Sequence, residues 1–182
     1  MTREPGPEVV AKARRVLMIA LDADGVLTDG SITVLADGGE ARSFHSRDGL
    51  GVKLGQKCGL KFAIVSGRSS RVVEARGKEL GFVAVEQGIA DKAACLARLA
   101  EREGIPLDAV CYMGDDLVDL PALRLAGLSA APADADAHVL RLVDWTSVAG
   151  GGRGAVRELI DLVLEARGAW ERATGAYFGG ER

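Results

Sequence analysis

The stretch VLMIALDADGVLTDG, residues 16–30, decides how the rest of the sequence is interpreted. It begins as an apolar run that contains β-branched residues and ends abruptly at Asp22, after which Asp24 and Gly25 open a polar segment. Such a run followed by Asp and Gly is typical of a buried parallel strand that leads into a loop. We therefore expect Asp22 and Asp24 at the carboxyl end of a strand, where open α/β sheets bind their ligands.

This pair of carboxylates has two interpretations. Two carboxylates so close in sequence can converge on one site if a divalent cation offsets their repulsion. The same residues also fit a solvated acidic turn, because short motifs often match by chance. The pair alone therefore leaves the function open.

Composition excludes several classes of protein. The 182 residues fit one domain, and 48% apolar with 27% charged residues is an ordinary globular balance. The net charge of -3 argues against nucleic-acid binding. Cys58, Cys95 and Cys111 lack metal-type spacing and are expected to be core residues of a reducing compartment. Without a signal-peptide pattern or a transmembrane-length segment, the chain is predicted to be cytoplasmic and not membrane-bound.

Strands and helices are expected to alternate, which predicts an α/β fold with a doubly wound parallel sheet and right-handed crossovers. After the first strand we expect strands or extended segments at 62–65, 82–85, 110–113, 128–130 and 144–148. Helices are expected at 9–15, 49–57, 72–80, 92–103, after 119 to about 126, 133–142 and 155–166. The whole chain, 1–182, is interpreted as one domain.

The connections carry further predictions. Residues 31–44 are predicted to form a β-hairpin, because Asp37-Gly38-Gly39 supplies the positive φ angles of a tight turn. Asp48 is expected to cap helix 49–57, and Asp91 to cap helix 92–103. Residues 150–154 are predicted to be a flexible break before the C-terminal helix and tail, about 154–182.

Residues 1–8 are predicted to be frayed, and the segment after residue 166 is predicted to be a polar tail.

Polar side chains gather where the expected strands end, and these ends share one edge in a doubly wound sheet. The group contains Asp22, Asp24, Ser66, Lys92, Asp115 and Asp116. Such a set supports phosphoryl transfer, in which a carboxylate attacks phosphorus and Mg²⁺ holds carboxylates and phosphate together. A hydroxyl and a lysine then bind the remaining phosphoryl oxygens.

The motifs resemble those of the haloacid dehalogenase superfamily of phosphatases over nearly the whole chain. The four ordered motifs are residues 22–30, Ser66-Gly67-Arg68, Lys92, and Gly114-Asp115-Asp116 with Asp119. More narrowly, the chain is similar to the 3-deoxy-D-manno-octulosonate 8-phosphate (KDO 8-phosphate) phosphatase group. That similarity is carried by the hairpin, Phe44 with Arg47-Asp48-Gly49, Gln87-Gly88 before Asp91-Lys92, Gly114-Asp115-Asp116-Leu117, and residues 149–158.

The resemblance implies a role for each acidic residue. Asp22 is the nucleophile, and Asp24 is the general acid and then the general base, with a backbone carbonyl that binds Mg²⁺. Asp115, with Asp22 and Asp24, completes the metal ligands. Asp116 and Asp119 are expected to orient the metal waters and Lys92.

The resemblance also implies the groups that bind substrate. Ser66 and the Gly67 amide hold the phosphoryl oxygens. Arg47 and Arg68 are candidates for the carboxylate of a sugar acid, because a guanidinium fork suits it. Both arginines also fit solvent-facing ion pairs. His45 stands where this group often has Asn and is interpreted as a connector residue.

The remaining notable side chains receive no catalytic role. His138 is expected on a surface helix, and Trp145 and Trp170 are expected to pack against the core.

No inserted cap domain has room between residues 30 and 66 or between residues 66 and 92. A single subunit would leave the aspartyl-phosphate open to water, and the hairpin's apolar edge requires a partner. The resemblance implies a homotetramer whose hairpins pack together at its centre. We predict that residues 150–154 and the C-terminal tail reach toward a neighbouring active site.

Other functions remain alternatives. The runner-up is a phosphatase of a nine-carbon sialic-type sugar acid 9-phosphate, or a broad sugar phosphatase; Arg68 favours the eight-carbon substrate. A phospho-acceptor signalling domain uses similar residues but carries its acceptor after the third strand. A catalytically inactive scaffold conflicts with the complete motif set, and a phosphomutase conflicts with the lack of a cap.

Overall fold

The computed structural model describes residues 5–179. The predictions of a frayed N-terminus and a polar tail lie outside the described residues where they concern residues 1–4 and 180–182. The predicted fraying is wrong at Pro7 and Glu8, which begin a helix. Within residues 5–179, no helix combines the length and the apolar character needed to cross a membrane.

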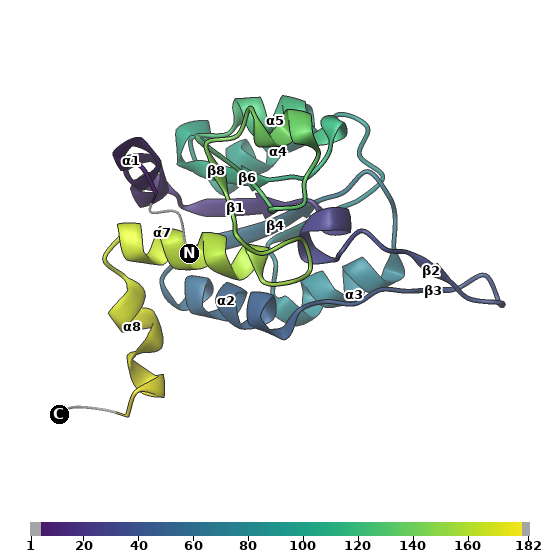
Figure 1. The fold of residues 1–182 in the computed structure, drawn as a ribbon, viewed down its shortest axis with the longest axis horizontal. Coiled ribbons are helices and arrows are strands. Elements are labelled where there is room, and N and C mark those ends of the chain that lie inside the picture. The colour runs from purple at the N-terminus through teal and green to yellow at the C-terminus, as the bar shows by residue number, and fades with distance from the viewer. Residues whose placement is uncertain (1–4, 180–182) are drawn as a thin grey trace.

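A six-stranded parallel sheet forms the centre of the molecule (Figure 1), in the order β5-β4-β1-β6-β7-β8. The strands are β1 Met18–Leu21, β4 Lys61–Val65, β5 Ala84–Glu86, β6 Val110–Met113, β7 Leu128–Ala131 and β8 Trp145–Thr146. All four residues of β1 are fully buried, as a central parallel strand requires. The predicted α/β fold with a doubly wound sheet is confirmed.

Helices cover both faces of the sheet (Figure 1). Ile19 and Leu21 of β1 face the core under α1, α2, α3 and α7, whereas Met18 and Ala20 face the core under α4, α5 and α6. The helices are α1 Pro7–Arg15, α2 Ser46–Lys57, α3 Arg71–Leu80, α4 Lys92–Glu103, α5 Leu120–Leu125, α6 Ala137–Leu140, α7 Ala155–Ala166 and α8 Trp170–Thr174.

The predicted hairpin is present as β2 Thr33–Val34 and β3 Glu40–Ala41, and it projects from the sheet (Figure 1). Its turn uses Gly38 at φ +82°. The paired strands are shorter than predicted, and Val34 is 74% exposed.

Asp91 caps α4 as predicted, because its carboxylate accepts the amide of Ala94 at 2.9 Å. The prediction that Asp48 caps α2 is wrong. The helix begins earlier, at Ser46, so Asp48 lies in its first turn. Its carboxylate instead accepts the Arg157 amide of α7 at 2.8 Å.

Three further predictions from the sequence are wrong. The predicted flexible break at 150–154 is a packed turn, in which the Gly152 amide donates to the Val26 carbonyl at 2.9 Å. The predicted polar tail contains α8, whose Ala173 is buried in the core. The expected helix 133–142 shortens to α6 because Asp136 caps it by accepting the His138 amide at 2.7 Å.

Candidate active site

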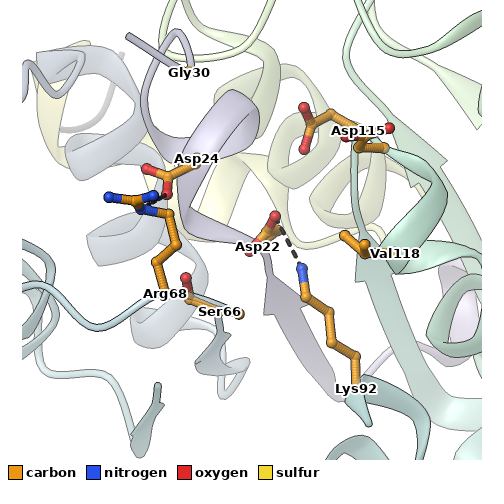
Figure 2. Close-up of a pocket in the computed structure, with 10 residues that line it drawn as sticks. Asp22, Asp24, Gly30, Ser66, Arg68, Lys92, Asp115 and Val118 are labelled. Carbon is orange, nitrogen blue, oxygen red and sulfur yellow. Dashed lines mark ion pairs between the residues drawn. The ribbon is translucent and has the colours of Figure 1, made fainter. Parts of the chain in front are cut away.

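A pocket of about 310 Å³ opens at the carboxyl ends of β1, β4 and β6 (Figure 2). The sheet order makes these three strands neighbours, so residues far apart in sequence meet there. The residues that line the pocket are Asp22, Asp24, Gly30, Ser66, Gly67, Arg68, Lys92, Asp115, Asp116 and Val118. Of the predicted site residues, Asp119 lies behind this lining and Arg47 lies away from it.

Lys92 links two buried carboxylates at the base of the pocket. Its Nζ lies 3.0 Å from Asp22 Oδ2, which Figure 2 marks, and 2.7 Å from Asp119 Oδ1. All three side chains are nearly inaccessible to solvent. Lys92 is the first residue of α4 and Asp22 directly follows β1, so rigid elements fix this pair. We refer to Asp22, Lys92, Asp115 and Asp119 as the strand-end group.

Both carboxylate oxygens of Asp119 accept hydrogen bonds. Its Oδ1 accepts the Tyr112 hydroxyl at 2.7 Å as well as Lys92. Its Oδ2 accepts the amides of Asp115 and Asp116 at 3.1 and 3.2 Å. Asp119 therefore holds Lys92 and the 115–116 turn in place.

Asp22 and Asp115, in contrast, each carry an unpartnered oxygen. Among the described residues, Asp22 Oδ1 and Asp115 Oδ1 are buried without a hydrogen-bond donor. Carboxylate oxygens of Asp22, Asp115 and Asp119 lie within 4.8 Å of one another. Buried oxygen atoms of this kind are suited to a hard divalent cation, and we infer that the residues fit Mg²⁺.

Electrostatics supports the same inference. Burial, followed by repulsion from Asp119, raises the pKa of Asp22 to about 6, although Lys92 opposes the rise. Burial and repulsion from Asp22 raise the pKa of Asp115 to about 7. Three carboxylates against one lysine leave an excess of negative charge that a divalent cation would neutralise.

Asp24 lies on the turn Ala23–Leu27, across the pocket from Lys92 (Figure 2). Its carboxylate lies 3.9 Å from Arg68 Nε and forms an ion pair with Arg42. Gly25 follows at φ +81°, and a Cβ there would lie 2.0 Å from Asp115 Oδ2. Only glycine allows the turn to pass so close to Asp115.

Arg42 is a site residue that the sequence analysis missed. Its side chain is 1% exposed, although it comes from the projecting hairpin. The guanidinium contacts Asp24 and also Glu40 Oε2 at 3.1 Å, and Glu40 accepts the Ser70 hydroxyl. The available signal was the spacing of Glu40 and Arg42, which places both on one face of a strand.

The remaining predicted residues occupy several environments. Ser66 is buried and follows β4, with Gly67 beside it in the lining. Asp116 accepts the Leu117 amide at 2.7 Å and caps the short helical turn Leu117–Asp119. Arg68 lies in the lining with its side chain 61% exposed. Arg47 is exposed on α2 and is not brought into the pocket.

The two histidines and the two tryptophans, to which no catalytic role was assigned, lie outside the pocket lining. His45 precedes α2, and His138 is exposed on α6 beside Asp136. Trp145 and Trp170 are partly buried against the core, as expected for packing residues.

Comparison with known sequences gives consistent results. A family profile described as haloacid dehalogenase-like hydrolase matches residues 52–127. The 3-deoxy-D-manno-octulosonate 8-phosphate phosphatase of Salmonella typhimurium is 40% identical over 169 residues, 93% of this chain and 90% of that protein. The enzyme of the same name from Escherichia coli K12 is 39% identical over 168 residues, 92% of this chain and 89% of that protein.

Solved structures agree with this similarity. The phosphatase of the same name from Moraxella catarrhalis, in complex with magnesium, phosphate and a KDO molecule, superposes with a TM-score of 0.91 at 36% identity. The match covers 93% of this chain and 98% of that one. The cobalt-bound Haemophilus influenzae phosphatase gives a TM-score of 0.87 at 37% identity, with 92% and 98% covered.

Proposed function

Because this chain belongs to the haloacid dehalogenase-like hydrolases, in the 3-deoxy-D-manno-octulosonate 8-phosphate phosphatase group, we propose that it hydrolyses that sugar acid phosphate through an aspartyl-phosphate on Asp22. One observation carries the mechanism: Lys92 is buried between Asp22 and Asp119, and a carboxylate oxygen of Asp115 lies within 4.8 Å of theirs. The family membership carries the choice of substrate.

In the first step, an Asp22 carboxylate oxygen attacks phosphorus and the bond from phosphorus to the sugar oxygen breaks. Asp24 gives its proton to that leaving oxygen, and Arg42 and Arg68 hold the Asp24 carboxylate on the side opposite Lys92. Ser66 and the Gly67 amide bind the phosphoryl oxygens, and Lys92 neutralises charge beside Asp22.

In the second step, Asp24 takes a proton from water, whose oxygen bonds to phosphorus. The bond from phosphorus to Asp22 breaks, which restores the carboxylate and releases phosphate. Asp24 is then protonated for the next cycle.

The metal ligands in this proposal are Asp22, Asp115 and the Asp24 backbone carbonyl, with Asp116 and Asp119 orienting the surroundings. When bound, Mg²⁺ supplies positive charge that draws the phosphate and the carboxylates together. The unpartnered oxygens of Asp22 and Asp115 support this ligand set.

The sugar acid's carboxylate needs a cationic partner. Arg68 is our candidate, because it lines the pocket and its side chain is largely exposed. Arg47 remains a candidate only toward the site of a neighbouring subunit, since it lies outside the pocket of its own chain.

Assembly and location also belong to this proposal. We propose a cytoplasmic homotetramer in which neighbouring subunits complete the active sites. The hairpin's exposed Val34 and Leu35 support the assembly, and the three unpaired, buried cysteines support a reducing compartment.

The test is phosphate release from a panel of sugar phosphates with Mg²⁺, with native protein and Asp22→Asn. We expect 3-deoxy-D-manno-octulosonate 8-phosphate to react fastest and Asp22→Asn to lose activity by about 10⁴-fold or more. Activity that survives this substitution would defeat the mechanism. Preference for a nine-carbon sugar acid 9-phosphate, or equal rates on unrelated phosphomonoesters, would remove the assigned substrate.

A further inference from the structure

Residues 149–154, which we call the glycine loop, pack directly against the turn that carries Asp24. A Cβ on Gly151 would lie 1.8 Å from the Gly25 carbonyl oxygen, and one on Gly152 would lie 2.5 Å from the Asp29 amide. The Gly152 amide donates to Val26, and Arg153 pairs with Asp29 at 3.1 Å. The two backbones are therefore too close for a side chain at Gly151 or Gly152 to fit without displacing the turn.

Gly25 lies between two close neighbours. Gly151 approaches it on one side, and on the other a Cβ on Gly25 would lie 2.0 Å from Asp115 Oδ2. In space, Gly25 therefore lies between Asp115 and Gly151, and neither glycine has a side chain. Because such close packing leaves no free space, the position of the glycine loop fixes the distance between the Asp24 turn and Asp115.

Carboxylates outside the pocket hold the glycine loop. Asp134 accepts the Gly151 amide at 2.9 Å. Glu158 of α7 accepts the amides of Val148 and Ala149 at 2.7 and 3.2 Å. None of these residues lines the pocket.

Asp48 secures the far end of the loop. The N-cap of α7 is Gly154, which has no side chain to cap the helix. Asp48 of α2 replaces that cap by accepting the Arg157 amide at 2.8 Å. The glycine loop is thus held at its start and its middle, and the helix that follows it is held in its first turn.

We propose that the glycine loop is a positioning element for catalysis, and that Asp134 is a positioning residue that acts through Gly151 and Gly25. The loop sets the Asp24 turn against Asp115, so it controls both Mg²⁺ affinity and the placement of the acid–base carboxylate. This inference rests on the proposed function only for its effect on turnover.

The first test is Gly151→Ala. Gly151 is not among the glycines at positive φ, so the added methyl group acts by pushing on the Asp24 turn, chiefly on the Gly25 carbonyl at 1.8 Å and less on the Thr28 carbonyl at 3.0 Å. We expect Mg²⁺ affinity by calorimetry to fall about 10- to 100-fold, as when the groups behind a metal ligand are disturbed. We expect kcat to fall by a similar factor with KM little changed. Gly6→Ala is the control, because Gly6 is exposed before α1 and nothing lies within 4 Å of its added methyl group.

The second test keeps the proposal falsifiable if Gly151→Ala fails to fold. Asp134 is exposed, so Asp134→Ala removes the hydrogen bond to Gly151 without opening the core. We expect it to weaken Mg²⁺ binding and lower kcat several-fold. Asp134→Asn loses the charge but keeps an acceptor, so it should behave as the native protein does.

The outcomes separate the two proposals. Native Mg²⁺ affinity in folded Gly151→Ala, or in Asp134→Ala, overturns the positioning role, even if the unfolding temperature drops. Equal losses in Asp134→Ala and Asp134→Asn would assign the effect to charge and also overturn it. If the native protein binds Mg²⁺ but hydrolyses no phosphomonoester, the proposed function fails and the Mg²⁺ measurements still decide the positioning role.

Discussion

The strand-end group and the β2–β3 hairpin both contact residues that line the pocket, but they are stabilised in opposite ways. Lys92, Asp22 and Asp119 are buried, and strands and helices of the central core fix them. The hairpin has two paired residues in each strand and exposes Val34, yet it delivers Arg42 to Asp24. We infer that the core alone builds the phosphoryl-transfer group, whereas control of the acid–base carboxylate depends on an element with little support from its own chain.

Lys92→Met should produce the largest loss of phosphatase activity, since it removes the only cation in the strand-end group. We expect phosphatase activity to fall about 10²- to 10³-fold, as when one charge-stabilising donor is lost. Two buried carboxylates would also lose their partner, so the free energy of unfolding without Mg²⁺ should fall.

Lys61→Met is the matched control for that substitution, because Lys61 pairs with Glu103 at 2.9 Å away from the pocket. An equal loss of activity in both variants would show that the location of the pair is unimportant.

Arg42→Met tests the hairpin's contribution, and its effect should be smaller. The Asp24 carboxylate would lose its buried partner while the strand-end group stays intact. We expect kcat to fall about 10- to 100-fold, since acid–base catalysis contributes roughly 10²- to 10⁴-fold and only part depends on position. Arg102→Met, which alters an exposed arginine, serves as the control. A native kcat in Arg42→Met would show that the hairpin does not contribute to catalysis.

Val34→Glu asks whether the hairpin needs a partner. In the proposed tetramer, a charge at this position would be buried against like charges, so we expect light scattering to detect smaller species at micromolar concentration. KM for the sugar phosphate should rise several-fold. Leu142→Glu alters an exposed apolar residue outside the hairpin and should leave the mass unchanged. A native protein that is already monomeric would contradict the proposed assembly.

The smallest expected effect is the pH dependence of stabilisation by Mg²⁺. The pKa values of Asp22 and Asp115, about 6 and 7, lie above their unfolded value of 3.8, so without metal these two groups destabilise the fold increasingly as the pH rises from about 4 to about 7. Mg²⁺ requires the ionised carboxylates. At about 100 times its Kd, it should raise the unfolding temperature by about 5 to 10 °C at pH 8 and far less at pH 5. Equal shifts at both pH values would place the cation elsewhere.

Local patterns allowed much of the strand-end group to be predicted from sequence. The apolar runs of β1 and β4 end directly at Asp22 and Ser66, that of β6 is followed by Gly114 and Asp115, and the parallel order of the strands brings those ends together. Asp91 and Gly104 likewise mark the two ends of α4, because capping depends only on nearby residues.

The remaining features depend on contacts that sequence spacing does not reveal. Arg42 reaches Asp24 because of the way the hairpin folds back. The sequence around Arg42 resembles that of a solvent-exposed strand and does not show this contact. Asp48 caps a helix that begins 107 residues later, at Ala155, instead of its own helix. The consecutive glycines at 150–152 suggested flexibility, but they are required for close packing against Gly25.

The most direct test of the central claim is detection of phosphate on Asp22. Asp24→Asn should slow hydrolysis of the intermediate, and quenching that variant during turnover of p-nitrophenyl phosphate, whose leaving group needs no proton from Asp24, should trap the aspartyl-phosphate. Borohydride reduction followed by mass spectrometry should then find Asp22 converted to homoserine. An unmodified peptide 16–30, or modification at a different residue, would contradict the account.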